Sequence, residues 1–292
     1  MILNPLGHTG LRVSALGFGA MHINDARTTE LEAGALLNHV LDQGINLVDT
    51  ARGYGLSEER IGRHIAHRRQ EFVLSTKVGY GVEGVPDWTY DCIVQGVERA
   101  LKLMKTEWLD IVHLHSCPLH TLQQGDVTRA LNDCRAAGKL RVAAYSGDNA
   151  EIDFAIESGA FGSLQTSVSL CDQAHLQHRA ARADHAGIGV IAKRPLAGAV
   201  WRFAERPADF AEGQYWDRFQ AMGLPGQEDW ADTALRFAAF HTGAASAIVG
   251  TAKPQNLRRN LDAIARGPLP PALATAIRDA FSHRGSDWPG LI

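Results

Sequence analysis

The sequence has few cysteines, few lysines and no long apolar run, and each scarcity excludes a class of protein. The four cysteines are widely spaced and form no CxxC pair, which argues against a disulfide framework and against a cysteine-bound zinc ion. A membrane-spanning helix needs about 18 or more consecutive apolar residues, and the sequence contains no such run. It also lacks the basic start and apolar run of a secretory signal, so we expect a cytoplasmic protein.

The sequence also has no excess of positive charge, with 29 Lys and Arg residues against 32 Asp and Glu residues. Surfaces that bind nucleic acid or anionic membranes need a basic excess, so neither partner is expected. Only six of the basic residues are lysines, and a scarce residue type at a special position deserves to be located. The hydrophobic fraction of 45% is typical of a globular chain with a sizeable core.

Short β-rich runs alternate with longer helical runs along the chain. The predicted strands are residues 15–18, 45–49, 72–77, 109–115, 140–146, 164–169, 188–192 and 247–249. The predicted helices are residues 29–43, 58–67, 90–105, 125–137, 150–157, 174–185, 230–241 and 255–264. Strands that alternate with helices indicate a parallel sheet, and eight such units favour a closed barrel over an open sheet. The sequence therefore predicts an α/β protein with a (β/α)8 TIM barrel, in a single domain of residues 1–292.

Three segments lie outside the repeat. Residues 1–12 contain a glycine-rich turn between short apolar runs and predict an N-terminal β-hairpin that could plug the bottom of the barrel. Residues 196–229 are rich in aromatic side chains and punctuated by Pro and Gly, and we expect a long functional loop there. A C-terminal helix and a tail of residues 286–292 complete the chain.

Ionisable side chains end three neighbouring predicted strands: Asp49, Lys77 and His115. Catalytic residues of such barrels come from the C-terminal ends of the strands, so these three can meet at the mouth. Tyr54 follows Asp49 in a glycine-flanked loop that can fold its ring over the mouth. An ammonium beside a phenol stabilises the phenolate, and a carboxylate keeps the ammonium charged and oriented. Together with a histidine that binds a carbonyl oxygen, the set can protonate that oxygen while hydride reaches the carbonyl carbon.

These residues and their neighbours resemble the aldo-keto reductases over nearly the whole chain. The matching elements are Leu16-Gly17-Phe18-Gly19-Ala20-Met21, Asp49-Thr50-Ala51 with Tyr54-Gly55 and Ser57-Glu58, the strand-end Lys77, and Asp110-Ile111-Val112-His113-Leu114-His115 with Pro118. The resemblance implies interconversion of a carbonyl and an alcohol with NAD(P)(H), on a barrel without a Rossmann domain. It implies that Tyr54 is the general acid/base, that Lys77 and Asp49 tune it, and that His115 orients the carbonyl.

The resemblance also implies a set of cofactor-binding residues. Ser146 and Gln165 match the positions that hold the carboxamide, whereas Gly147 replaces the usual Asn and Lys193 replaces the usual stacking aromatic residue. The full predicted set is Gly19, Ala20, Met21, Asp49, Ser146, Gln165, Lys193, Arg194, Pro195, Leu196, Gly250, Thr251, Lys253, Asn256, Arg259 and Asn260. Positive charge on Lys253, Arg258 and Arg259 favours a 2′-phosphate, and so NADP over NAD. The expected partner is therefore a small carbonyl compound, reduced with NADPH.

Five other interpretations compete with this one. Residues 79–84 satisfy G-x-G-x-x-G, but the dinucleotide fingerprint must open directly into a helix, and here a Val-Pro-Asp-Trp run follows. His113 and His115 form an H-x-H pair typical of barrel metal sites, yet the later strands end in poor ligands, and no metal is expected. Lys77 can form a Schiff base in a lyase, and Cys117 can act as a thiol nucleophile. A barrel that binds NADP as a sensor or regulatory subunit is the remaining alternative.

Overall fold

Eight parallel strands close into a barrel in the computed structural model, which describes residues 1–291 of the chain. Ile292, the last residue of the predicted tail, lies outside the described residues. The strands are β3 (Leu16–Gly19), β4 (Leu47–Asp49), β5 (Val73–Val78), β6 (Leu109–His115), β7 (Leu140–Ser146), β8 (Ser163–Ser167), β9 (Gly189–Lys193) and β10 (Ser246–Gly250). β10 pairs with both β9 and β3, which closes the sheet. The predicted (β/α)8 barrel is confirmed.

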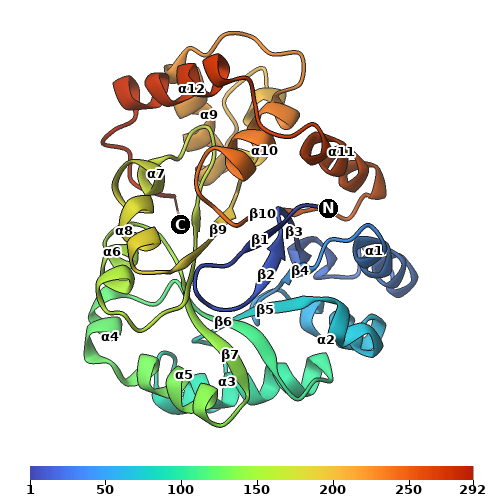
Figure 1. Cartoon of the computed structure of the whole chain (residues 1–292). Coiled ribbons are helices and arrows are strands. Elements are labelled where there is room, and N and C mark those ends of the chain that lie inside the picture. The colour runs from blue at the N-terminus through green and yellow to red at the C-terminus, as the bar shows by residue number, and fades with distance from the viewer. Residues whose placement is uncertain (292) are drawn as a thin grey trace.

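Helices surround the strands in a ring, and most of them pack against the outer face of the barrel (Figure 1). They are α1 (Glu30–Asp42), α2 (Ser57–His64), α3 (Tyr90–Met104), α4 (Leu119–Gln124), α5 (Asp126–Ala136), α6 (Asn149–Glu157), α7 (Ala174–His178), α8 (Ala180–His185), α9 (Phe210–Met222), α10 (Trp230–Phe240), α11 (Pro254–Ala265) and α12 (Pro271–Arg284). Short 3-10 helices cover Ala20–Ile23 (η1), Ala66–Glu71 (η2) and Ala197–Arg202 (η3). Across residues 1–291, no helix has the length and apolar character needed to cross a lipid bilayer.

An N-terminal hairpin covers the barrel end at which the strands begin. Its strands are β1 (Leu3–Pro5) and β2 (Arg12–Ser14), and they pair antiparallel. Figure 1 shows this dark-blue hairpin across the centre of the ring of helices. The apolar side chains of the hairpin and of the turn between its strands pack with those inside the barrel, in one cluster that includes Leu6, Leu11, Val13, Leu47, Ile111 and Ile248. The hairpin predicted from residues 1–12 is therefore present, and its apolar side chains fill the barrel floor.

Two predictions of local structure were wrong. The segment 196–229 is not one long loop, because it contains η3 and the 13-residue helix α9. Asp209 caps the start of α9 by accepting a hydrogen bond from the backbone N–H of Glu212, and Gly223 ends it with a left-handed φ of 56°. The single helix predicted over residues 174–185 is broken at Arg179, whose φ of −124° is not helical, into α7 and α8.

A second apolar cluster lies outside the barrel, where α9, α10 and α12 pack together with the end of the chain. It includes Tyr215, Phe237, Ile277, Phe281 and Leu291, all buried. The predicted C-terminal helix is α12, and the tail after it returns to the mouth of the barrel. α9 and α12 lie side by side at one edge of the molecule (Figure 1). This cluster thus anchors both insertions that the barrel repeat does not require.

We expect the hairpin to contribute to global stability. Leu6 is fully buried in the barrel floor, so Leu6→Ala should lower the free energy of unfolding by about 2–5 kcal/mol, measured by urea denaturation. Leu31→Ala is the matched control, because Leu31 is 84% exposed on α1, and it should change that free energy by less than about 0.5 kcal/mol. Equal effects of the two substitutions would show that the hairpin is not part of the cooperative unit.

Candidate active site

The structure brings the predicted strand-end residues together at the mouth of the barrel. Asp49 is the last residue of β4, Lys77 lies one residue before the end of β5, and His115 is the last residue of β6. The Nζ atom of Lys77 lies 2.6 Å from Oδ2 of Asp49, and both side chains are buried. A buried charge is costly unless it is paired and hydrogen-bonded, so this ion pair determines how the surrounding groups are arranged.

The polar contacts of this ion pair come from the barrel strands and from the loop that follows β4. Lys77 also donates to the backbone oxygen of Thr50 at 2.8 Å, and Oδ1 of Asp49 accepts from Ser75 at 2.8 Å and from Gln165 at 2.9 Å. Burial alone disfavours the ammonium, but the Asp49 carboxylate and Tyr54 together outweigh it and raise the pKa of Lys77 above its usual value. Lys77 is therefore a fixed cation. A Schiff-base lysine must be neutral to attack a carbonyl, so the ion pair opposes the lyase interpretation.

Tyr54 lies over this ion pair, in the loop between β4 and α2. Its ring centroid is 5.1 Å from the ammonium of Lys77 and 6.0 Å from the ring of His115, with an interplanar angle of 85°. Gly55 holds the loop against the turn after β3: its φ is 44°, and an added Cβ would meet the backbone oxygen of Asn24 at 2.3 Å. Glycine adopts this backbone conformation and close approach without strain, and thus fixes the direction from which Tyr54 enters the mouth.

His115 is held as a neutral imidazole. Burial, followed by the positive charge of Lys77, lowers the pKa of His115 to about 3. Its Nδ1 atom lies 2.8 Å from the hydroxyl oxygen of Tyr80, and the two rings stack with centroids 5.5 Å apart. Tyr80 was absent from the predicted set. Its position could have indicated this contact, because Tyr80 lies three residues after Lys77 and just beyond the end of β5, where loops border the mouth.

His113 lies one layer deeper in the barrel. Its side chain is fully buried, and its Nε2 atom lies 3.2 Å from the hydroxyl of Ser75. Burial lowers the pKa of His113 to about 4. Among residues 1–291, no group of three or more His, Cys, Asp or Glu side chains is arranged to hold a metal ion.

Six of the predicted cofactor residues line one cavity of about 500 Å³ beside the mouth, namely Leu196, Gly250, Thr251, Asn256, Arg259 and Asn260. The cavity lies between the end of β10, η3, the start of α10 and one side of α11, and its lining also includes Glu228, Asp229 and Asp232. Arg259 contacts Oδ2 of Asp229 at 3.4 Å. The cavity thus carries amide, hydroxyl and guanidinium donors next to three carboxylates.

A chain of hydrogen bonds links a further pair of predicted cofactor residues to the ion pair. The hydroxyl of Ser146 donates to Oε1 of Gln165 at 3.2 Å, and the amide of Gln165 donates to Asp49. Gly19, at the end of β3, and Ala20 and Met21, in η1, border the same end of the barrel. Lys253 is exposed at the N-cap of α11, outside the cavity lining, and Pro195 is buried between β9 and η3.

The basic residues at the end of β9 have partners within the protein. Lys193 lies 2.7 Å from Oδ2 of the buried Asp148, and Arg194 donates to the backbone oxygen of Leu291 at 2.6 Å. Asn149 also holds the tail. Its side-chain amide nitrogen donates to the backbone oxygen of Gly290, and its amide oxygen accepts from the backbone N–H of Gly290. Neither partner was predicted, since each lies far away in the sequence from the residue that it binds.

The other competing motifs occupy ordinary structural positions. The loop of residues 79–84 is followed by a turn at Trp88, and α3 begins only at Tyr90. Burial raises the pKa of the Cys117 thiol to about 12, which opposes its use as a nucleophile. All four cysteines are buried and unpaired in residues 1–291.

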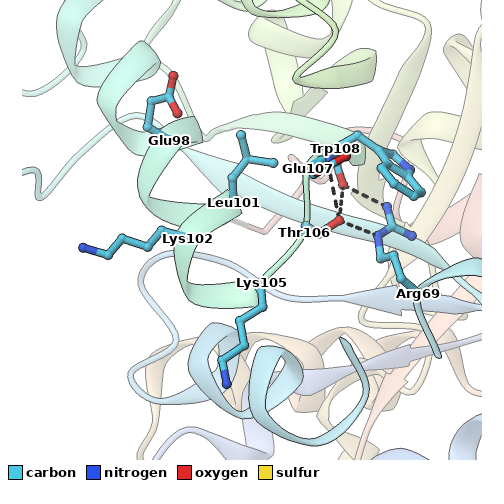
Figure 2. Close-up of a pocket in the computed structure, with 8 residues that line it drawn as sticks. All are labelled: Arg69, Glu98, Leu101, Lys102, Lys105, Thr106, Glu107 and Trp108. Carbon is cyan, nitrogen blue, oxygen red and sulfur yellow. Dashed lines mark hydrogen bonds between the residues drawn. The ribbon is translucent and has the colours of Figure 1, made fainter. Parts of the chain in front are cut away.

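A separate pocket lies at the opposite end of the barrel, beside the C-terminal end of α3 (Figure 2). Arg69 forms one wall: it donates to the Thr106 hydroxyl and to the backbone oxygen of Trp108, while Lys102 and Lys105 project from α3. Its volume, about 500 Å³, equals that of the cavity at the mouth. Size therefore does not identify the site, and the candidate active site rests on the buried ion pair and its neighbours.

Comparisons with known proteins identify the family and the fold. The model of the aldo/keto reductase family matches residues 15–280, so the chain belongs to that family of oxidoreductases. The chain is 28% identical to L-galactose dehydrogenase of Arabidopsis thaliana over 67% of its length and 65% of that enzyme. It is 26% identical to the uncharacterized oxidoreductase YqkF of Bacillus subtilis, over 88% of this chain and 89% of that one. The solved holo structure of aldo-keto reductase AKR11C1 from Bacillus halodurans shares its fold, with a TM-score of 0.85 and 24% identity over 98% and 97% of the two chains.

The buried neutral His113 predicts an acid-sensitive fold. Its folded-state pKa is about 4, against an ordinary value of 6.5. Between these values the unfolded chain binds a proton that the folded chain does not, so stability falls as the pH drops through this range. One such group lowers the free energy of unfolding by up to about 1.4 kcal/mol per pH unit.

The matched variant is His113→Asn, which removes this titration. Urea denaturation at about pH 7 and about pH 5 should show a smaller loss of stability in the variant than in the wild type, even if the variant is less stable at both. Parallel pH dependences of the two proteins would show that folding does not lower the pKa of His113.

Proposed function

We propose that this protein transfers hydride between NADPH and the carbonyl group of an aldehyde or ketone, with Tyr54 as the general acid and base. The observation that carries the proposal is the buried Lys77–Asp49 ion pair with Tyr54 directly above it and neutral His115 beside it. A fixed cation next to a phenol favours the phenolate that remains when the proton leaves. A purely binding barrel has no need of that arrangement.

Each residue of the set has a distinct task in the proposed reaction. Tyr54 donates its phenolic proton to the carbonyl oxygen as negative charge develops there, and takes a proton back in the reverse direction. Lys77 stabilises the resulting phenolate, and Asp49 keeps Lys77 in place. His115, neutral at physiological pH, donates a hydrogen bond to the carbonyl oxygen and holds it near Tyr54.

The residues at the mouth fit a nicotinamide dinucleotide. When bound, NADPH supplies the hydride. Gln165 and Ser146 offer an amide and a hydroxyl beside Asp49, which suits a carboxamide, and the 500 Å³ cavity offers donors for the adenosine end. The N-terminal end of α11, at Pro254, adds partial positive charge there. Arg259 supports the preference for a 2′-phosphate, against the opposing charge of Asp229 and Glu228 in the same cavity.

The first test removes one oxygen atom. Tyr54→Phe should lower kcat by about 10²–10⁴-fold while NADPH binding, followed by fluorescence titration, stays nearly unchanged. The matched control is Tyr90→Phe, because Tyr90 bonds to Asp133 on the outer surface and its loss should leave kcat intact. The assay is NADPH oxidation against a panel of aldehydes and ketones.

Two outcomes would contradict the proposal. If Tyr54→Phe kept most of its kcat, Tyr54 would not be the acid. If the wild type bound NADPH tightly but turned over no carbonyl compound, the sensor interpretation would replace the enzymatic one.

The second test concerns the choice of cofactor. Arg259→Ala should weaken NADPH binding by about 10–100-fold, the value of a charge-assisted hydrogen bond, and leave NADH binding nearly unchanged. Arg258 was predicted from the sequence to favour the 2′-phosphate as well, but it does not line the cavity. Arg258→Ala is therefore the control, on the residue of α11 that precedes Arg259. Equal losses for both cofactors, or tighter binding of NADH by the wild type, would contradict the preference for NADPH.

A further inference from the structure

Tyr80 is the closest polar neighbour of His115, although nothing in the proposed reaction uses it directly. Its hydroxyl lies 2.8 Å from Nδ1 of His115, the rings stack at 27°, and Trp88 meets Tyr80 edge-on at 6.0 Å. Among the described residues, His115 is the one hydrogen-bond partner of this hydroxyl. The contact therefore joins a group at the rim of the mouth to the side chain that is proposed to hold the carbonyl.

The loop that carries Tyr80 is braced. Arg52 donates to the backbone oxygen of Tyr80 at 2.7 Å, and Asp87 accepts from the backbone N–H of Gly81 at 2.7 Å. The backbone N–H of Trp88 donates to Gly79 at 2.7 Å and closes the loop. Arg52 lies two residues before Tyr54, so the same stretch of chain supports Tyr80 and carries the proposed acid. The hydroxyl of Tyr80 is thus presented to His115 from a fixed backbone.

The direction of this hydrogen bond decides what His115 can do. A neutral imidazole carries one proton, so one ring nitrogen donates and the other accepts. If Nδ1 carries the proton, Nε2 is an acceptor and repels a carbonyl oxygen. If Tyr80 donates to Nδ1, the proton of His115 lies on Nε2, which is the nitrogen left for a ligand.

The surroundings favour donation by Tyr80. A phenol is the stronger donor of the two, because its proton is more acidic than the N–H proton of a neutral imidazole. Burial and the nearby Tyr54 raise the pKa of Tyr80 above its usual value, so the phenol keeps its proton. We propose that Tyr80 is a positioning residue that donates to Nδ1 of His115, and thereby holds the proton of the imidazole on Nε2, facing the substrate. The role of that proton rests on the proposed function, whereas its location does not.

Nitrogen NMR of the histidine ring tests the location without any substrate. In the 15N-labelled wild type, Nδ1 of His115 should resonate as an unprotonated nitrogen and Nε2 as a protonated one. Tyr80→Phe keeps the stacked ring but removes the donor, so both resonances should move toward intermediate, averaged values. Tyr90→Phe should leave them unchanged. His115→Asn assigns the signals by their disappearance.

A second substitution displaces the hydroxyl instead of removing it. A Cβ at Gly53 would lie 2.9 Å from the hydroxyl oxygen of Tyr80, closer than ordinary contacts allow, so Gly53→Ala should push this oxygen away from Nδ1. We expect the ring nitrogens of His115 to shift in the same direction as in Tyr80→Phe. A wild type with its proton on Nδ1, or a Tyr80→Phe variant with unchanged nitrogen resonances, would overturn the proposal.

Steady-state kinetics separate this proposal from the proposed function. If both hold, Tyr80→Phe should lower kcat/KM for a carbonyl substrate by about tenfold, with NADPH affinity unchanged, because part of the His115 population presents the wrong tautomer. Altered nitrogen resonances without carbonyl turnover in the wild type would support the tautomer assignment and contradict the proposed reaction. Unchanged nitrogen resonances in Tyr80→Phe, together with full loss of activity in Tyr54→Phe, would contradict the tautomer assignment and support the proposed reaction.

Discussion

The ion pair between Lys77 and Asp49 is the constraint on which the mouth of the barrel depends. Two opposite charges in an interior of low polarity must stay in close contact, because either charge left unpaired would strongly destabilise the fold. The pair is satisfied by Ser75 from β5, by Gln165 from β8 and by the backbone after β4, so it ties opposite sides of the barrel together. Tyr54 and His115 acquire their electrostatic surroundings from this arrangement: the first lies over a permanent cation, and the second stays neutral beside it.

A second buried carboxylate organises the neighbouring part of the mouth in the same way. Asp148 pairs with Lys193 and also accepts from Thr166 and Ser167, and Ser167 in turn donates to the backbone of Leu291. The end of the chain is thereby fastened to β8 and β9. Lys77 and Lys193 are thus each neutralised by an aspartate from another segment.

The strands and their polar ends could be predicted from the sequence because buried β-rich runs and the ionisable residues that end them are local features. The bounds of β6 and β7 agree with prediction to the residue. Helix α9 was missed although Asp209 and Gly223 mark its ends, because its aromatic residues lie on several faces and obscure the helical period. The contact of Tyr80 with His115 depends on how a loop folds back, and that of Arg194 with Leu291 joins residues 97 positions apart, so neither follows from local pattern.

The scarcity of lysine has a practical consequence once the lysines are placed. Lys77 is buried and Lys193 is ion-paired. The lysines at the end of α3 and just before β7 lie at the end of the barrel that the N-terminal hairpin covers, namely Lys102, Lys105 and Lys139. Lys253 is the exposed exception near the mouth. Reagents that couple primary amines to a bead or a sensor chip will therefore attach this protein mainly by the hairpin-covered end, and will leave the mouth facing the solution.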